Sequence, residues 1–262
     1  SSAVNVLQSN FGNPGSIANN TISGVTGTGA ITGLFIGSSG TISALNISTN
    51  NIGGLSSTGA GGAVIGISNT VAATTVTIST NGVNTLSSSS GAVTGIVSSA
   101  GGTVSITGNT VHTLSSTGAA TSNVISVTGG TTVTVSANKI YNCEANYSNA
   151  SISGILSGGG TTVNLQNNLI GDLRTPSSVS PNSLIGMNIT GGTNVNVRFN
   201  TVYLNGTSTG VNWGSSAIHA ATTSTVTLNN NILVNTSTPS GGNLTVAYRR
   251  ATTTLATYGA GS

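Results

Sequence analysis

The stretch Thr131-Thr132-Val133-Thr134-Val135-Ser136-Ala137-Asn138-Lys139-Ile140 carries the pattern on which the whole chain is built. Its valines alternate with threonines, and this period of two places the valines on one face of a strand and the threonines on the other. Asn138 follows Val133 by five residues, and Ile140 begins a second apolar pair that ends at Cys143. The stretch therefore predicts a β-strand, a bend at the asparagine and a further strand.

The same pattern returns at a nearly constant interval along the chain. Successive asparagines of the pattern are 30, 31, 28, 29, 30, 32 and 31 residues apart. A fixed period in this range is typical of a solenoid, in which each repeat stacks on its neighbours. The column consists of Asn20, which follows a weaker strand, and of Asn50, Asn81, Asn109, Asn138, Asn168, Asn200 and Asn231.

We expect one elongated domain of eight coils over residues 1–262, in which residues 236–262 lose the period and form a partial coil, a linker or a cap. Each period contains three short apolar runs separated by Gly, Ser, Thr or Asn. This arrangement predicts an all-β fold with three short strands per coil and no helix.

The first strand of each coil contains two apolar residues three positions apart, with a small residue between them that fits a bulge. The pairs are Ile31/Leu34, Val64/Ile67, Val93/Ile96, Val124/Val127, Ile152/Ile155, Leu184/Met187 and Ile218/Ala221. The small residues are Gly33, Gly66, Gly95, Ser126, Gly154, Gly186 and Ala220.

Together these residues resemble the right-handed parallel β-helix of the pectate-lyase type, which has three strands per coil and a buried asparagine ladder at one bend. The resemblance covers nearly the whole chain, and it implies that the amides of the asparagine column hydrogen-bond up and down the stack. Asparagine suits such a bend because it tolerates left-handed backbone geometry and satisfies local backbone groups. The segments Asn230 to Asn235 and Ala247 to Arg250 are similar to repeat regions of very large secreted surface proteins of bacteria, which implies an extracellular location at a cell surface.

Composition narrows the classes of partner. Five Lys+Arg and two Asp+Glu in 262 residues leave a neutral, hydroxyl-rich surface without the clustered basic residues that nucleic acid requires. The sequence contains no run of about eighteen apolar residues, so we predict no membrane span. The chain opens at Ser1 without a charged and apolar leader, and we interpret it as a processed product or a segment of something longer.

The only carboxylates are Glu144 and Asp172, 28 residues apart and therefore expected on neighbouring coils of one edge, with Lys139 and Arg174 close in sequence. Polysaccharide-active enzymes on the resembled fold use carboxylate clusters as general acid and base or to hold calcium. Two isolated carboxylates beside basic residues more often form a solvated surface cluster. We therefore predict no catalytic residue and no cofactor.

The other reactive side chains also favour structural roles. His112 and His219 lie at outward strand positions without a Cys, Asp or second His at metal-ligand spacing, so we predict no metal site. Cys143 falls in an apolar column with Leu114 and Leu173, which predicts a small buried hydrophobe rather than a reactive thiol.

The outward residues of the second strand form two parallel columns that stand out as a candidate binding face. Strands stacked roughly 4.8 Å apart would arrange these residues as a flat lattice of hydroxyl and methyl groups. Such a lattice resembles the Thr-x-Thr face of β-solenoid ice-binding proteins, although Thr is also simply a good exposed strand residue. The candidate positions are Thr75, Thr77, Thr103, Ser105, Thr132, Thr134, Thr162, Asn164, Thr225 and Thr227, and Ala44, Asn46, Asn194 and Asn196 interrupt the same columns.

Three functional hypotheses remain open from the sequence. The first is a non-enzymatic extracellular module that forms a rod, fibre, stalk or adhesin and associates end to end as a homo-oligomer or filament, or continues into neighbouring domains of a longer chain. The second is an ice-binding or carbohydrate-binding protein that uses the Thr/Asn face. The third is a degenerate polysaccharide-active enzyme, which only the spacing of the two carboxylates supports.

Overall fold

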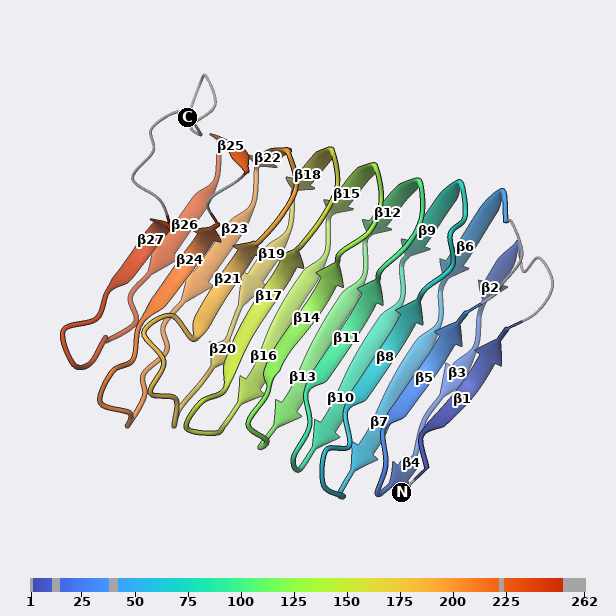
Figure 1. Ribbon diagram of the computed structural model, residues 1–262, viewed down its shortest axis with the longest axis horizontal. Coiled ribbons are helices and arrows are strands. Elements are labelled where there is room, and N and C mark those ends of the chain that lie inside the picture. Colours follow the sequence, from blue (N-terminus) through green and yellow to red (C-terminus); the bar gives the residue numbers. More distant parts are fainter. Residues whose placement is uncertain (1, 11–14, 38–41, 222–223, 252–262) are drawn as a thin grey trace.

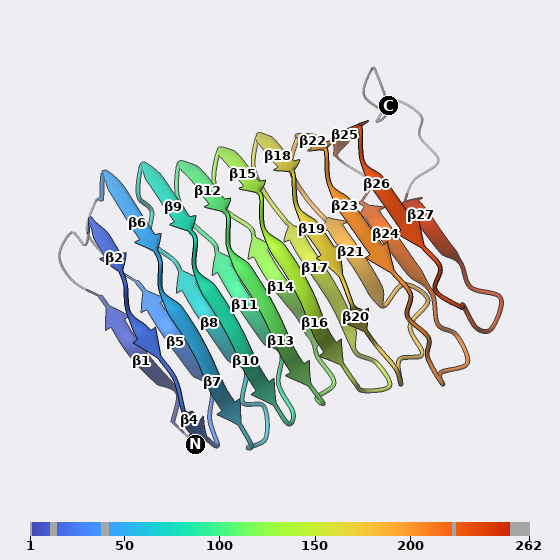
Figure 2. The same ribbon diagram turned by 180° about the vertical axis from the view of Figure 1, so that it is seen from behind.

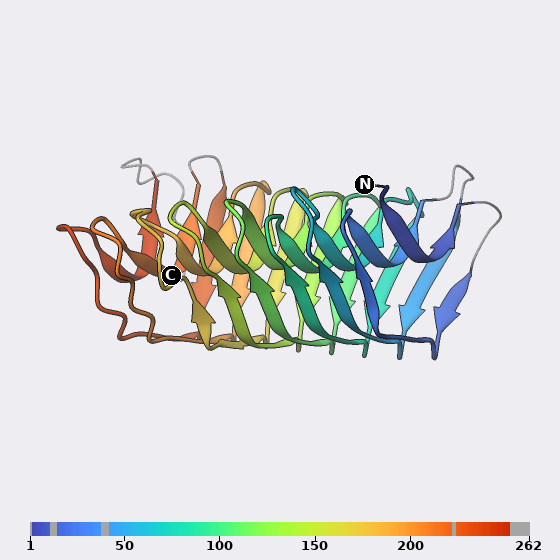
Figure 3. The same cartoon turned by 90° about the horizontal axis from the view of Figure 1, so that it is seen from below.

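The computed structural model describes residues 2–10, 15–37, 42–221 and 224–251, and every regular element within them is a β-strand. The strands pair in parallel and succeed one another as coils along a single axis from the N-terminal to the C-terminal end (Figures 1 and 3). Each coil contributes to three sheets in turn, which Figure 2 shows from behind. The prediction of an all-β parallel solenoid with about eight coils is confirmed.

The first and second sheets contain one strand from each coil. The first sheet runs in the order β1 (Val4–Ser9), β5 (Ile31–Ile36), β8 (Val64–Asn69), β11 (Val93–Ser98), β14 (Thr121–Val127), β17 (Ser151–Ser157), β21 (Leu184–Ile189), β24 (Ser215–Ala220) and β27 (Thr245–Arg250). The second sheet runs in the order β2 (Ser16–Ala18), β6 (Ala44–Ser48), β9 (Thr75–Ser79), β12 (Thr103–Thr107), β15 (Thr132–Ser136), β18 (Thr162–Gln166), β22 (Asn194–Arg198) and β25 (Thr225–Asn229).

The third sheet is divided into shorter strands in two of its coils. It contains β3 (Thr21–Ile22), β4 (Val25–Gly27), β7 (Asn51–Ser57), β10 (Gly82–Ser88), β13 (Thr110–Ser116), β16 (Lys139–Ala145), β19 (Leu169–Gly171), β20 (Leu173–Arg174), β23 (Thr201–Leu204) and β26 (Ile232–Asn235). At the C-terminal end β27 pairs with β24 in register, so residues 245–250 begin a ninth coil in the first sheet.

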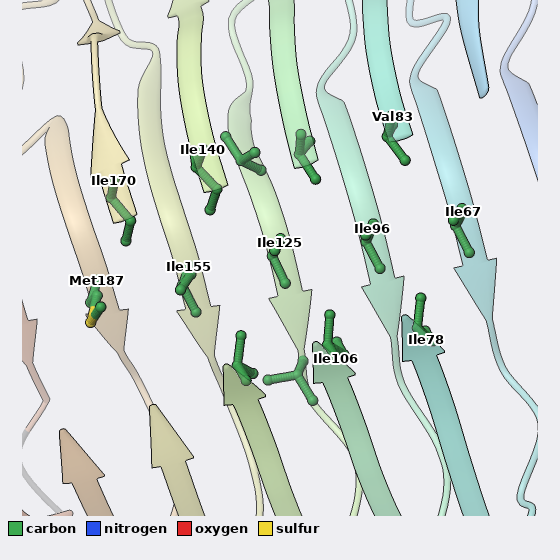
Figure 4. Close-up of a cluster of buried hydrophobic side chains, with 14 of the residues drawn as sticks. Ile67, Ile78, Val83, Ile96, Ile106, Ile125, Ile140, Ile155, Ile170 and Met187 are labelled. Atoms are coloured by element: carbon green, nitrogen blue, oxygen red, sulfur yellow. The ribbon is translucent and has the colours of Figure 1, made fainter. Parts of the chain in front are cut away.

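The core lies between the three sheets and repeats from coil to coil. Ile67, Ile96, Ile125, Ile155 and Met187 pair in register on neighbouring strands of the first sheet and form one row along the axis (Figure 4). All five are fully buried. Burial of such a side chain contributes about 1.5–3 kcal/mol to the free energy of folding. Each side chain of the row packs between those of the neighbouring coils, so this stabilisation depends on the stack rather than on any single coil.

The predicted asparagine ladder occupies the bend between the second and third sheets. From Asn20 to Asn200, each Nδ2 donates to the Oδ1 of the asparagine one coil later at 2.9 or 3.0 Å. The same Oδ1 accepts the backbone N–H of the earlier asparagine at 2.9 to 3.1 Å. From Asn50 onward, Nδ2 also donates to a backbone carbonyl of the coil before. Every hydrogen-bonding site of an interior ladder amide is therefore used.

The left-handed backbone at this bend belongs to the residue before each asparagine, so the expectation that the ladder asparagines themselves adopt it is wrong. Ala137 has φ 55°, and Phe199 has φ 57°. The full set is Asn19, Thr49, Thr80, Gly108, Ala137, Asn167, Phe199 and Asn230. A left-handed residue turns the chain sharply, and this turn lets the next residue point its amide into the stack.

The first-strand column of coil five differs from the sequence prediction. Ile125 pairs with Ile96 and Ile155, so the column pair is Ser122/Ile125 rather than Val124/Val127, and Val124 rather than Ser126 lies between them. Ser122 can occupy this buried position because its Oγ accepts the N–H of Val93 at 3.1 Å.

Coil eight shows the same shift. Ile218 pairs with Met187, which makes the column pair Ser215/Ile218 instead of Ile218/Ala221 and puts Ala217, not Ala220, between them. The buried hydroxyl of Ser215 hydrogen-bonds to Asn235, so a polar residue again satisfies an inward position that alternation alone assigns to an apolar one.

The small residues of this column are required by the facing third strand. A Cβ on Gly95 would lie 2.4 Å from Cγ1 of Val111 and 2.6 Å from the carbonyl oxygen of Val124. In coil five, however, the column residue is Val124, and it is fully buried. The facing leucine of coil four also lies near this position, with Cδ2 of Leu114 3.6 Å from the Cβ added to Gly95. Coil five has the smaller Cys143 where coils four and six have leucine, and we infer that this leaves part of the space that Val124 fills.

The first prediction concerns the ladder. Asn138→Leu removes the acceptor used by Asn109 and the donors used by Asn168 and Ile106, and buried polar groups without partners each cost about 1–3 kcal/mol. We expect a loss of about 2–4 kcal/mol in the free energy of unfolding, measured by denaturant titration. Asn46→Leu, at an exposed strand position, is the control, and equal stability of both variants would contradict a stabilising ladder.

The second prediction concerns packing in coil five. Cys143→Leu alone overfills the core and should lower stability by about 1–3 kcal/mol. Val124→Gly alone leaves a cavity, but the double variant restores the glycine and leucine pair of coil four. We therefore expect a favourable coupling energy in a double-mutant cycle by thermal or denaturant unfolding. Additive effects of the two substitutions would show that the side chains do not share one space.

Candidate functional site

The candidate face on the second sheet has the register that the sequence predicts. Thr75, Thr103, Thr132 and Thr162 lie on neighbouring strands in one outward column. The second column contains Thr77, Ser105, Thr134 and Asn164, and the two columns continue to Ala44 and Asn46 at one end and through Asn194 and Asn196 to Thr225 and Thr227 at the other. The side chains of this face therefore form an ordered array.

The unbroken part of this array is small. Within the described residues, the strands β9, β12 and β15 are the one run of neighbouring strands in which each strand presents a hydroxyl residue at both positions, and β25 does so by itself. Beyond them, Asn196 donates to the Oδ1 of Asn164 at 3.0 Å, and Arg198 donates to the Oδ1 of Asn196 at 3.3 Å. These amides satisfy one another along the face, so the chemistry of the array changes from hydroxyl to amide at coil six.

The two carboxylates lie on the third sheet and share Arg174. Its Nε lies 3.2 Å from Oε2 of Glu144, and its Nη1 bonds to Oδ1 of Asp172. Its Nη2 donates to Oδ1 of Asn142 at 2.6 Å. Burial alone would lower the pKa of Arg174, but the hydrogen bonds and charges of Asp172 and Glu144 outweigh burial and raise it.

This geometry corrects the expected stacking of the carboxylates. Glu144 pairs in register with Arg174 rather than with Asp172. Both carboxylates are engaged by one guanidinium at a partly exposed position, which favours the surface-cluster interpretation of these residues.

The histidines have different surroundings. The ring of His112 stacks on that of Tyr141 at a centroid distance of 4.7 Å and an interplanar angle of 8°. Nδ1 of His219 lies 2.9 Å from Oδ1 of Asn188. Burial lowers the pKa of both imidazoles, with smaller contributions from Lys139 at His112 and from Arg249 at His219.

Cys143 is fully buried, as predicted, and stacks between Leu114 and Leu173. Burial raises the pKa of its thiol to about 12, which leaves it protonated at neutral pH. A protonated, inaccessible thiol is a poor nucleophile.

Other kinds of site were sought within the described ranges. Those ranges bring no three His, Cys, Asp or Glu side chains close enough to share a metal ion, and they enclose no pocket. They also contain no helix with the length and apolar character of a membrane span.

The outer face of the third sheet is the feature that the sequence reasoning missed. It carries Tyr141, Tyr203 and Leu169, with the two last-named about half exposed, and Nζ of Lys139 lies 5.0 Å from the ring centroid of Tyr141. That two tyrosines two coils apart lie on one face can be recognised only once the register of the coils is known. The repeat period gives that register, so the spacing from Tyr141 to Tyr203 was an available signal.

Comparisons with protein-family models, curated proteins and solved structures each found no match for this chain.

Proposed function

We propose that this chain is a non-enzymatic, extracellular structural module whose stacked coils form a stiff segment of a surface fibre, stalk or adhesin. The observation that carries the proposal is the continuous parallel pairing of strands through three sheets from β1 to β27. Every interior coil is hydrogen-bonded to a coil on each side. Such a stack resists bending because each bend would break pairing in at least one sheet.

The surface chemistry supports the same proposal. The second sheet presents mostly Ser, Thr and Asn. The chain has five Lys+Arg and two Asp+Glu, and four of these seven charged residues lie in the segment from Lys139 to Arg174. Arg174 already bonds to both carboxylates of this group. A surface of this composition is soluble while it offers little for general acid and base catalysis.

We also propose the finer assignment to the right-handed β-helix of the pectate-lyase type, and an origin in a secreted bacterial surface protein. Three strands per coil and an amide ladder at the bend after the second strand support this assignment. End-to-end association is part of the proposal, because β1 and β27 are edge strands of the first sheet with one side open within the described residues. The same edges suit further coils of a longer chain.

An ice-binding or carbohydrate-binding role of the Thr/Asn face is the second candidate, favoured by the register of its two columns. Against it, the hydroxyl array covers three strands, which corresponds to about 10 Å along the axis at the usual strand spacing. A lattice of this size offers few repeated contacts to a crystal surface.

The association prediction is tested at the N-terminal edge. Val4 donates its N–H to Ala30, so the N–H of the next residue, Asn5, points away from β5. Asn5→Pro removes this outward donor and should weaken association. We expect the unmodified chain to form concentration-dependent oligomers or filaments in analytical ultracentrifugation and electron microscopy, and Asn5→Pro to shift them towards monomer. A monomer at every concentration would contradict self-association.

The face prediction uses Thr132→Lys combined with Thr134→Lys. A structural face needs only soluble strand formers, so this double variant should keep its fold, its stability to within about 0.5 kcal/mol and its oligomeric state. We expect no thermal hysteresis from the unmodified chain in nanolitre osmometry. Hysteresis that disappears in the double variant would establish the ice-binding role instead.

A further inference from the structure

An outward column on the third sheet places aromatic rings along the axis. It runs through Asn84, His112, Tyr141, Gly171, Tyr203 and Val234 on the strands from β10 to β26, which lie side by side (Figure 2). Gly171 takes its place beside Tyr141 because the two preceding pairs, Lys139/Leu169 and Ile140/Ile170, are in register. The rings of His112 and Tyr141, on neighbouring coils, are nearly parallel and stack with their centroids 4.7 Å apart, so these two rings follow one another along the axis. Gly171 is the position in this column that has no side chain.

The missing side chain leaves an open gap between two tyrosines. Gly171 lies between Tyr141 and Tyr203 in the column, and a Cβ added to it would meet nothing closer than the carbonyl oxygen of Tyr203 at 3.6 Å. Two strand spacings separate the tyrosines, about 9.6 Å along the axis. A flat aromatic ring in van der Waals contact on both faces needs only about 7 Å, whereas a puckered six-membered sugar ring with axial hydrogens is thicker and fills the space better.

The groups around the gap match the chemistry of a sugar. Leu169, two residues before Gly171 on the same strand, is 47% exposed and adds apolar surface. Asp172 follows Gly171 directly, and its carboxylate is held by Arg174, so hydroxyl groups of a ligand would meet an oriented acceptor and donor. His112 covers one face of the Tyr141 ring, and Nζ of Lys139 lies 5.0 Å from the centroid of that ring, so this flexible side chain borders the gap. It moves aside when a sugar stacks on Tyr141 and then supplies a further donor.

We propose that this tyrosine gap, formed by Tyr141, Gly171, Tyr203 and Asp172, binds a pyranose ring of a glycan. The C–H faces of the sugar stack on the two tyrosines, and its hydroxyl groups bond to the Asp172 and Arg174 pair. A few oriented polar groups beside apolar and aromatic surface are typical of small-molecule recognition. The site lies on a different sheet from the Thr/Asn face and does not depend on the chain acting as a structural module.

The test fills the gap from inside. Gly171→Tyr places a third aromatic ring in the gap, at a position where a Cβ is tolerated, and it should abolish binding while the fold is kept. Gly82→Tyr is the matched control, because Gly82 is an outward glycine of the same sheet in the neighbouring column. Binding of cellohexaose, chitohexaose and mannohexaose is measured by isothermal titration calorimetry and saturation-transfer NMR, with circular dichroism to check the fold.

We expect at least one of the three hexasaccharides to bind the unmodified chain with a Kd of about 1 mM or tighter. Binding should weaken at least tenfold in Gly171→Tyr and in Tyr203→Ala, and persist in Gly82→Tyr and in Tyr147→Ala, which removes a tyrosine of similar exposure outside the gap. Absence of binding by all three sugars overturns the proposal, as does binding that survives Gly171→Tyr. Binding lost only in the Thr132→Lys and Thr134→Lys double variant assigns the sugar to the second sheet instead.

Discussion

The amide-to-amide hydrogen bond at the bend after the second strand is the interaction on which the stack depends. A bend buried between coils leaves backbone groups that no strand can pair, and unpaired buried groups are costly. Asparagine resolves this because one short side chain has two acceptor sites and two donor hydrogens. In interior coils both donors and both acceptor sites are used, one donor reaching the next coil and the other the coil before. The bend of each coil is thus fixed by its neighbours, which keeps all three sheets in register.

The sequence predicted the fold because a solenoid repeats its own constraints. Alternation gave the strands, the period gave the register, and the asparagine column located the bend. The left-handed residues at the same bend were not predicted, because their column holds Ala137, Phe199 and several Thr and Asn but only one glycine. The ladder restricts this position to one backbone conformation whatever residue occupies it, so residue type carries little signal there.

The errors in the first-strand column have a different physical origin. Alternation treats every inward position as apolar, whereas Ser122 and Ser215 are buried with hydrogen-bond partners for their hydroxyl groups, the N–H of Val93 and the amide of Asn235. Position-by-position reading also assumes that each column has one size of residue. Coil five has Val124 where its neighbours have glycine and Cys143 where they have leucine, which fits a volume that is conserved within a coil rather than within a column, because the two facing strands share one layer of the core.

The same logic explains why the third sheet is where the surface becomes distinctive. Inward positions and bends are constrained in every coil, so variation between coils is free to accumulate on outward positions. The Thr/Asn face of the second sheet stays close to a repeat, whereas the third sheet gathers His112, Tyr141, the Glu144 and Arg174 pair, Gly171 and Tyr203 over four coils. Because the ladder fixes the register beneath them, these side chains are held at strand spacing, and His112 stacks on Tyr141 while Arg174 bonds to Glu144. A stack of coils in register thereby positions aromatic and polar groups at regular intervals, which is the geometry that the proposed glycan site uses.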